Sequence, residues 1–190
     1  MTISPTTLPG VLLIQPKRFE DERGWFTESL RKDLLENVIG HTLDFCQDNQ
    51  AYSRYGVIRG LHYQMPPFAQ SKIVAVLEGS ILDVAVDIRR GSAYFGKHLA
   101  LELSSENQKQ LYIPRGFAHG YACLNERSLV TYKVDNYYNK ATEASITFND
   151  PQLAIDWQIP SEKQVLSPKD QQHPTFEEAQ CFDFNTPLYD

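Results

Sequence analysis

The chain has 190 residues, 22% of them charged, and a net charge of −6, which is the profile of an ordinary globular protein. This length predicts a single domain, residues 1–190, that buries a core without disulfide bonds. The acidic balance excludes a protein that follows the phosphates of a nucleic acid, because such a protein needs a basic face. Three cysteines without metal-site spacing predict reduced thiols and a cytoplasmic protein, and no apolar run reaches the length of a membrane span.

Short apolar runs alternate with turn signals along most of the chain, which predicts an all-β protein. In chain order, strands are expected at residues 10–16, 24–29, 73–77, 81–88, 98–113 (with a turn at 104–107), 121–124 and 129–134. Three hairpins are expected among them, with turns at 78–80, 104–107 and 125–128. Only residues 30–39 have a helical pattern, and four prolines between 151 and 174 predict loops and one-turn helices.

Two short segments resemble the motifs of cupin barrels. Residues 114–119, Pro-Arg-Gly-Phe-Ala-His, match the second motif and end at His119. The first motif is only partly present, because Gln64 stands where a metal-binding cupin has its second histidine after His62. A neutral amide is a poor ligand for the transition metals that imidazole binds. We therefore expect a cupin-type jelly-roll β-barrel with short peripheral helices and no metal.

Arg59 and His62 lie three residues apart on a predicted strand. Strict pleating would send their side chains to opposite faces of the sheet. Gly60 lies between them, and a glycine in a strand often marks a β-bulge. A bulge at Gly60 is therefore predicted if both side chains reach one pocket.

Five longer segments carry a more specific resemblance. They are residues 21–28 (DERGWFTE), 56–64 (GVIRGLHYQ), 83–92 (DVAVDIRRGS), 113–120 (IPRGFAHG) and 166–170 (LSPKD). In this order and spacing they resemble the dTDP-4-dehydrorhamnose 3,5-epimerases, from about residue 10 to residue 184. The resemblance implies a homodimer without metal or organic cofactor. It also implies inversion of C3 and C5 of a dTDP-4-keto-6-deoxyhexose, a step that feeds L-rhamnose synthesis.

The implied reaction assigns roles to four side chains. A ketone at C4 acidifies the hydrogens on C3 and C5, so the enzyme needs a base, an opposing acid and a group that holds the enolate oxygen. His62 is expected to be the base, since imidazole titrates near neutral pH, with Asp170 as its orienting partner. Tyr132 is expected to be the acid. Lys72 is expected to stabilise the enolate, while Asp83 orients either His119 or Lys72.

The resemblance also implies a set of substrate-binding residues. Arginine forks suit diphosphate oxygens, and an aromatic ring suits the thymine base. In the family, part of the nucleotide site comes from the partner subunit, so Arg23 and Glu28 are expected to act across a dimer interface. The full predicted set is Arg23, Glu28, Gln47, Asn49, Arg59, His119, Tyr138, Glu143 and Lys169.

Three alternatives remain open at this point. A relative that inverts only C3 or only C5 would share the barrel and the His-Asp pair. A metal-dependent cupin is disfavoured by Gln64. A sugar-binding cupin without activity would bind a dTDP-sugar without exchanging its protons with solvent.

Overall fold

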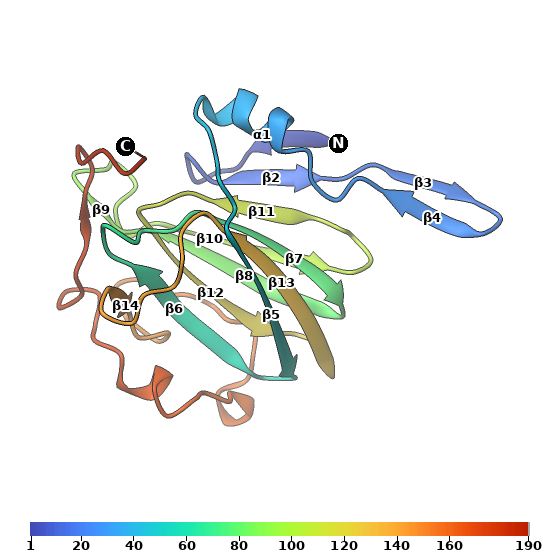
Figure 1. Ribbon diagram of the computed structural model, residues 1–190. Helices are drawn as coiled ribbons and strands as arrows, with labels where there is room; N and C mark the ends of the chain where they lie inside the picture. Colours follow the sequence, from blue (N-terminus) through green and yellow to red (C-terminus); the bar gives the residue numbers. More distant parts are fainter. Residues whose placement is uncertain (190) are drawn as a thin grey trace.

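Two antiparallel β-sheets face each other in the computed structural model, which describes residues 1–189 (Figure 1). The six-stranded sheet runs in the order β1 (Thr2–Pro5), β2 (Leu12–Gln15), β11 (Gln110–Ile113), β7 (Lys72–Glu78), β13 (Arg127–Val134) and β5 (Gln47–Arg54). The five-stranded sheet runs in the order β10 (His98–Ser104), β8 (Ser80–Asp87), β12 (Phe117–Cys123), β6 (Ile58–Gln64) and β14 (Glu143–Ser145). The all-β cupin-type prediction is confirmed.

The remaining elements are short and lie around the barrel. They are the hairpin β3 (Arg18–Asp21) with β4 (Gly24–Thr27), the parallel pair β9 (Arg89–Arg90) with β15 (Phe182–Asp183), the helix α1 (Lys32–Ile39), and the 3-10 turns η1 (Ser161–Lys163) and η2 (Asp170–Gln172). Residues 151–174 thus form loops with single-turn helices, as expected. No helix within residues 1–189 is long and apolar enough to cross a membrane.

The three predicted hairpins are wrong, and for one reason. β7 and β8 follow each other in the chain, yet β7 pairs with β11 and β13, whereas β8 pairs with β10 and β12. Strands β10 and β11 are also divided between the two sheets, as are β12 and β13. Each turn therefore carries the chain from one sheet to the other, as in a jelly roll. Apolar alternation identifies a strand, but it does not identify the strand's partner.

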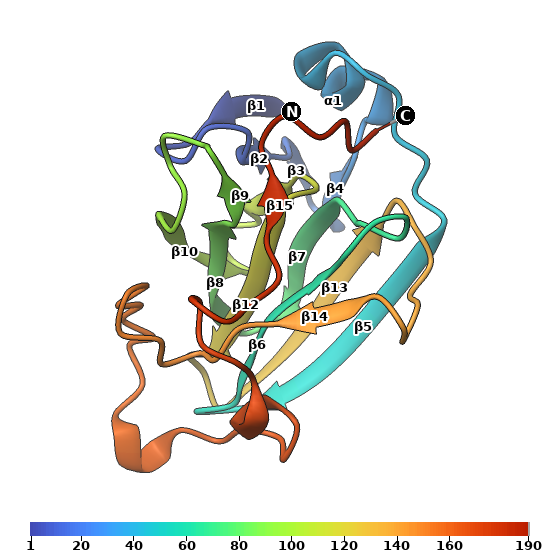
Figure 2. The same cartoon turned by 90° about the vertical axis from the view of Figure 1, so that its left-hand side faces the viewer.

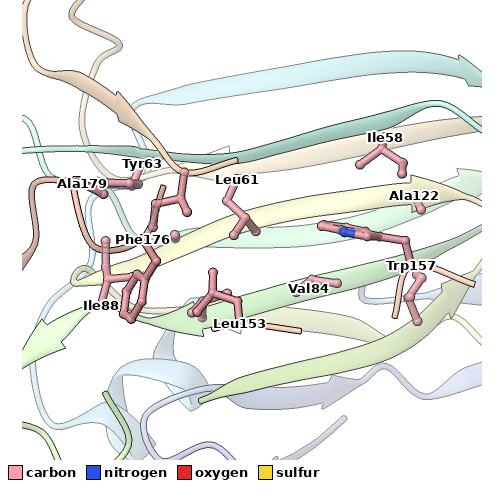
Figure 3. Packing of buried hydrophobic residues seen from close by; sticks show 14 of the residues in the cluster. Ile58, Leu61, Tyr63, Val84, Ile88, Ala122, Leu153, Trp157, Phe176 and Ala179 are labelled. Carbon is pink, nitrogen blue, oxygen red and sulfur yellow. The ribbon is translucent and has the colours of Figure 1, made fainter. Parts of the chain in front are cut away.

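Strand β8 is buried on both faces, because each face packs on a different core. Ile81 and Ala85 point between the two sheets, into a cluster with Val74, Leu111 and Val130. The alternate residues point away from the barrel interior, and their cluster includes Leu82, Val84, Val86, Leu153, Trp157, Phe176 and Phe182 (Figure 3). This alternation places Asp83, which lies between Leu82 and Val84, on the interior side with Ile81 and Ala85.

The C-terminal segment covers the outer face of the five-stranded sheet. Leu153, Trp157 and Phe176 supply its apolar side chains, and β15 then runs beside β9 (Figure 2). This cover leaves Asp170 close to β6, although the two are far apart in sequence. At the other end of the molecule, β3 and β4 extend away from both sheets (Figure 1).

Candidate active site

A cavity of about 500 Å³ opens between the two sheets. It is lined by all four predicted catalytic residues and by seven of the nine predicted binding residues. These are His62, Lys72, Tyr132 and Asp170, and Gln47, Asn49, Arg59, His119, Tyr138, Glu143 and Lys169. The two exceptions are Arg23 and Glu28. The cavity therefore brings together residues from five long strands, the short strand β14 and two loop segments.

Strand β6 carries the bulge that the sequence predicts. His62 pairs with His119, whereas Arg59 pairs with Tyr121, so three steps along β6 match two steps along β12. Gly60 lies at the bulge with φ of 119°, a conformation that L-residues with a side chain rarely adopt. As a result, Arg59 and His62 both line the cavity. The structural prediction made for Gly60 is confirmed.

His62 and Asp170 form the shortest contact between predicted catalytic groups. The Nε2 atom of His62 lies 2.7 Å from Oδ1 of Asp170. Burial raises the pKa of Asp170, but hydrogen bonds from His62 and Ser167 outweigh it and hold that pKa at about 2. The carboxylate is therefore an acceptor only, and Nε2 of His62 carries the proton. In the neutral ring, Nδ1 is then the nitrogen with the free lone pair.

Ser167 was not predicted from the sequence, although it anchors Asp170. Its hydroxyl donates to Oδ2 of Asp170 at 2.7 Å and accepts from the Asp170 backbone N–H at 3.1 Å. Ser167 and Asp170 stand three residues apart, which is the Ser-x-x-Asp spacing of a capping box, and that spacing was the available signal. The two hydrogen bonds fix the carboxylate that in turn orients His62.

Lys72 is buried on the opposite sheet from His62. Lys72 is 8% exposed, and its Nζ donates a hydrogen bond to the backbone oxygen of His62 at 3.4 Å. Burial lowers the pKa of Lys72 to about 8, while the negative charge of Asp83 opposes that shift. The ammonium form still predominates at pH 7. A cation in this position can neutralise an anion that develops in the cavity.

Asp83 bonds to His119, which is one of the two partners expected for it. Nε2 of His119 lies 2.7 Å from Oδ1 of Asp83, and Asp83 is completely buried. Burial lowers the pKa of His119 even though Asp83 acts in the other direction. At neutral pH, His119 is therefore a neutral ring that donates to Asp83, and its orientation is fixed by that bond.

Tyr132 enters the cavity from β13, on the sheet that faces His62. Burial raises the pKa of Tyr132, with the Arg59 charge opposing it, so the phenol keeps its proton at neutral pH. Arg59 is held in place by bonds to Ser53 Oγ and the Tyr52 carbonyl, both at 3.1 Å. The candidate base and the candidate acid therefore lie on facing sheets, and the cationic side chains of Arg59 and Lys72 line the same cavity.

A family model described as dTDP-4-dehydrorhamnose 3,5-epimerase matches residues 5–178. The chain belongs to the dTDP-4-dehydrorhamnose 3,5-epimerase family. The curated epimerase of Shigella flexneri is 43% identical over 182 residues, which cover 96% of this chain and 99% of the relative.

Solved structures of the dTDP-4-dehydrorhamnose 3,5-epimerase family share the fold closely. The enzyme from Elizabethkingia anophelis NUHP1 is 48% identical with a TM-score of 0.91, covering 94% of this chain and 97% of its own. A dTDP-6-deoxy-D-glucose-3,5-epimerase from Legionella pneumophila Philadelphia 1, solved in complex with dTDP-4-keto-L-rhamnose, is 41% identical with a TM-score of 0.92, covering 97% and 99%.

The outer part of the cavity holds the residues predicted to bind the nucleotide in this family. The hydroxyl of Tyr138 donates to Glu143 at 2.9 Å, and Nζ of Lys169 lies 2.5 Å from the same carboxylate. The backbone N–H of Tyr138 donates to Gln47, whose amide donates to Asn49. Tyr138 is 53% exposed, so its ring is available to a planar ligand.

Gln64, at the position of the missing cupin histidine, is committed to loop contacts. Its Oε1 accepts from the Asn139 backbone N–H at 2.6 Å, and its Nε2 donates to the carbonyls of Phe68 and Tyr137. The Gln64 amide thus connects β6 to the loop segment on either side of Tyr138. This side chain shapes the cavity wall and offers no lone pair beside His62.

Arg23 and Glu28 do not reach the cavity of their own chain. Arg23 lies in the turn of the β3–β4 hairpin and pairs with Asp21, while Glu28 follows β4 and lies 3.7 Å from Arg31. The hairpin extends away from the barrel (Figure 1). Within one chain, these two predicted binding residues are therefore separate from the other seven.

Proposed function

We propose that this chain inverts C3 and C5 of dTDP-4-dehydro-6-deoxy-D-glucose to form dTDP-4-dehydro-L-rhamnose, for dTDP-L-rhamnose synthesis. The carrying observation is the His62–Asp170 pair, with a separation of 2.7 Å, on the sheet opposite Tyr132. A base and an acid on opposite sides of a ring are what inversion at carbon requires. The family membership supports the same reaction.

The base step begins at Nδ1 of His62. That nitrogen takes the proton from C3 or C5, and the electron pair moves through the new C–C double bond onto the C4 oxygen. The imidazolium formed is stabilised by Asp170, which already accepts the Nε2 proton. The buried ammonium of Lys72 stabilises the enolate oxygen.

The acid step uses Tyr132. Its phenol donates a proton to the face of the carbon opposite the one His62 deprotonated, and the C4 ketone forms again. The tyrosinate then recovers a proton from solvent, and His62 releases its own. No proton or electron is gained or lost over the cycle, and in this mechanism Lys72 supplies the positive charge at the enolate oxygen, so no metal or organic cofactor takes part.

The nucleotide is assigned to the mouth of the cavity. Arg59 and Lys169 supply positive charge for the diphosphate, and the exposed ring of Tyr138 offers a stacking surface for thymine. Gln47, Asn49 and Glu143 lie around that ring and supply polar contacts, while His119 contacts the sugar beside Lys72. These assignments follow from position and chemistry together.

Arg23 and Glu28 are assigned to the site of a second subunit in a homodimer. Both lie on or after the projecting β3–β4 hairpin, whose Phe19, Trp25 and Phe26 are exposed. Phe19 and Phe26 pair on one face of the hairpin and Trp25 lies on the other, and exposed aromatic side chains gathered on one element are typical of an interface. We also place the protein in the cytoplasm as one functional unit of residues 1–190, in keeping with its three unpaired cysteines.

Proton exchange in D₂O tests the reaction. After turnover of dTDP-4-dehydro-6-deoxy-D-glucose with a chelator present, we expect deuterium at both C3 and C5 of the product. Label at one carbon only would contradict the double inversion and support a single epimerase. Activity that is lost with the chelator and restored by Fe, Mn or Zn would contradict the metal-free mechanism. His62→Asn should abolish exchange and leave dTDP binding intact.

Subunit mixing tests the dimer assignment. Arg23→Ala and His62→Asn homodimers should both be impaired, the first in substrate affinity and the second in exchange. If Arg23 serves the partner, a mixed dimer contains one site with both residues intact, and activity returns on mixing. Mixed dimers with no recovered activity would place Arg23 outside the partner's site.

A further inference from the structure

A third histidine lies against the His62–Asp170 pair and has no role in the proposed reaction. Nε2 of His173 lies 3.6 Å from Oδ1 of Asp170, and its ring meets the His62 ring edge-on with centroids 5.2 Å apart. The His173 side chain is only 4% exposed. Neither of its ring nitrogens has a hydrogen-bond partner within residues 1–189. A buried imidazole without any partner calls for a physical reason.

We propose that His62, Asp170 and His173 form a binding site for a divalent transition metal such as Zn²⁺, and that the bound metal inhibits the enzyme. One ligand atom from each residue lies within 4.8 Å of the others. Two histidines and one carboxylate are a common donor set for these ions and leave coordination positions open. Zn–N bonds of about 2.0 Å place neighbouring donor atoms roughly 3.3 Å apart around the ion. Movements of the side-chain donor atoms by about 1 Å therefore bring them to bonding distance.

The unpartnered His173 is what distinguishes this cluster from an ordinary His-Asp pair. Its Nε2 lies near the same oxygen of Asp170 that bonds His62, the two rings are in edge-on contact, and burial keeps water from satisfying its nitrogens. Asp170 remains anchored by Ser167 through its second oxygen, so Oδ1 stays directed at both rings. An ion reaches the site through the cavity that His62 and Asp170 line.

Inhibition follows from the tautomer of His62, and this part of the inference rests on the proposed function. In the free enzyme Nε2 carries the proton and Nδ1 the lone pair. A metal that takes the place of the Nε2 proton binds the lone pair of that nitrogen, and the neutral ring then carries its single proton on Nδ1. The nitrogen that should accept a proton from the sugar is thereby blocked.

Direct metal binding is the primary test, because it does not depend on catalysis. Chelator-treated enzyme is titrated with Co²⁺, and its visible spectrum is recorded, with Zn²⁺ as the competitor. We expect one ion per chain, together with loss of proton exchange that a chelator reverses. In the wild-type protein, Co²⁺ should broaden the ring proton signals of His62 and His173 and leave those of His98 sharp.

Two variants separate the site from general histidine binding. His173→Asn should weaken Co²⁺ and Zn²⁺ binding by roughly 10- to 100-fold or more, since changes even one step removed from a metal have that effect. In the absence of metal, His173→Asn should keep most of the wild-type rate of proton exchange with D₂O. His98→Asn, a change on β10 far from the cluster, should bind like wild type. Equal binding by wild type and His173→Asn, or broadening that spares His173, would overturn the site.

A separate outcome addresses the mechanism alone. If Co²⁺ binds with His173 dependence but proton exchange continues at its full rate, the site stands, whereas the proposed inhibition and the assignment of Nδ1 of His62 as the base both fail. If the free enzyme shows no exchange at all, the proposed function fails whatever the spectra show. The three results are therefore distinguishable.

Discussion

Gly60 and Gly120 face each other across β6 and β12 with no space for a side chain between them. A Cβ added to Gly60 would lie 2.6 Å from the Cα of Gly120 and 2.7 Å from the backbone oxygen of His119. This close approach is what allows the bulge that turns both Arg59 and His62 into the cavity. The backbone contact at the two glycines therefore determines the geometry of the site.

Gly60→Ala should disrupt both stability and activity. The variant meets backbone atoms that cannot move independently and also requires φ of 119°. We expect it to lose about 2 kcal/mol or more relative to a matched glycine variant, from overlap in a packed region. Gly24→Ala is that control, because Gly24 has φ of 125° but nothing within 4 Å of its Cβ position. Urea unfolding compares the two variants, and equal losses of stability in both would argue against the contact. D₂O exchange is measured on Gly60→Ala alone, because Gly24 lies beside Arg23.

The bulge itself was predictable, because it depends on local features. Arg59 and His62 stand three apart with a glycine between them, and only an extra residue puts both on one face. The catalytic and binding residues of the cavity were instead identified by the resemblance to the dTDP-4-dehydrorhamnose 3,5-epimerases, since no local pattern connects β6, β13 and the loop at Asp170. Their roles in catalysis remain predictions, since position alone does not establish them.

Strand pairing and the third histidine were not predictable by such local arguments. The runs that became β7 and β8 looked like a hairpin, but long-range packing of both faces of β8 sends them to different sheets. Strand β5 was missed because its polar alternation, suited to an edge strand over a cavity, resembles a loop. His173 belongs to no motif, and only the fold of the C-terminal segment brings it to His62.

Tyr132→Phe should separate proton removal from inversion. His62 remains able to take a proton from the sugar and return a solvent-derived one to the same face. We therefore expect substrate that gains deuterium without changing configuration, while product formation falls about 10²- to 10⁴-fold, the usual contribution of a general acid. Mass spectrometry and NMR of the recovered sugar measure the two quantities. Unlabelled substrate would mean that Tyr132 also takes part in proton removal.

Lys72→Met should raise stability while it removes activity. The pKa of Lys72 is about 8 in the folded chain and 10.5 without burial, so the unfolded chain binds this proton more tightly. Wild-type stability therefore rises as the pH increases from about 8 to 10.5, and at pH 7 the buried charge destabilises the fold by up to about 3 kcal/mol. The Lys72→Met variant also removes the positive charge that faces Asp83, and this loss offsets part of the gain in stability.

The pH dependence of unfolding checks this assignment. The variant should be more stable than wild type at pH 7, and the difference should shrink between pH 8 and pH 10.5. Product formation should be lost across the whole range, because the ammonium group assigned to the enolate oxygen is absent at every pH. A variant that is less stable at pH 7, with a difference that does not change with pH, would show that Lys72 has a structural role.

Asp170→Asn should impair the base without removing it. An amide can donate to Nε2 of His62, which favours the tautomer with its proton on Nδ1 and blocks the lone pair that the reaction needs. We expect kcat to fall about 10²-fold or more, as for other changes to a catalytic base, with dTDP affinity little changed. Ser167→Ala provides a graded comparison. It removes one hydrogen bond to the carboxylate, worth roughly 1 kcal/mol, and should lower kcat only about fivefold. If the two variants had equal kcat values, Asp170 would act through the loop that holds it and not through the tautomer of His62.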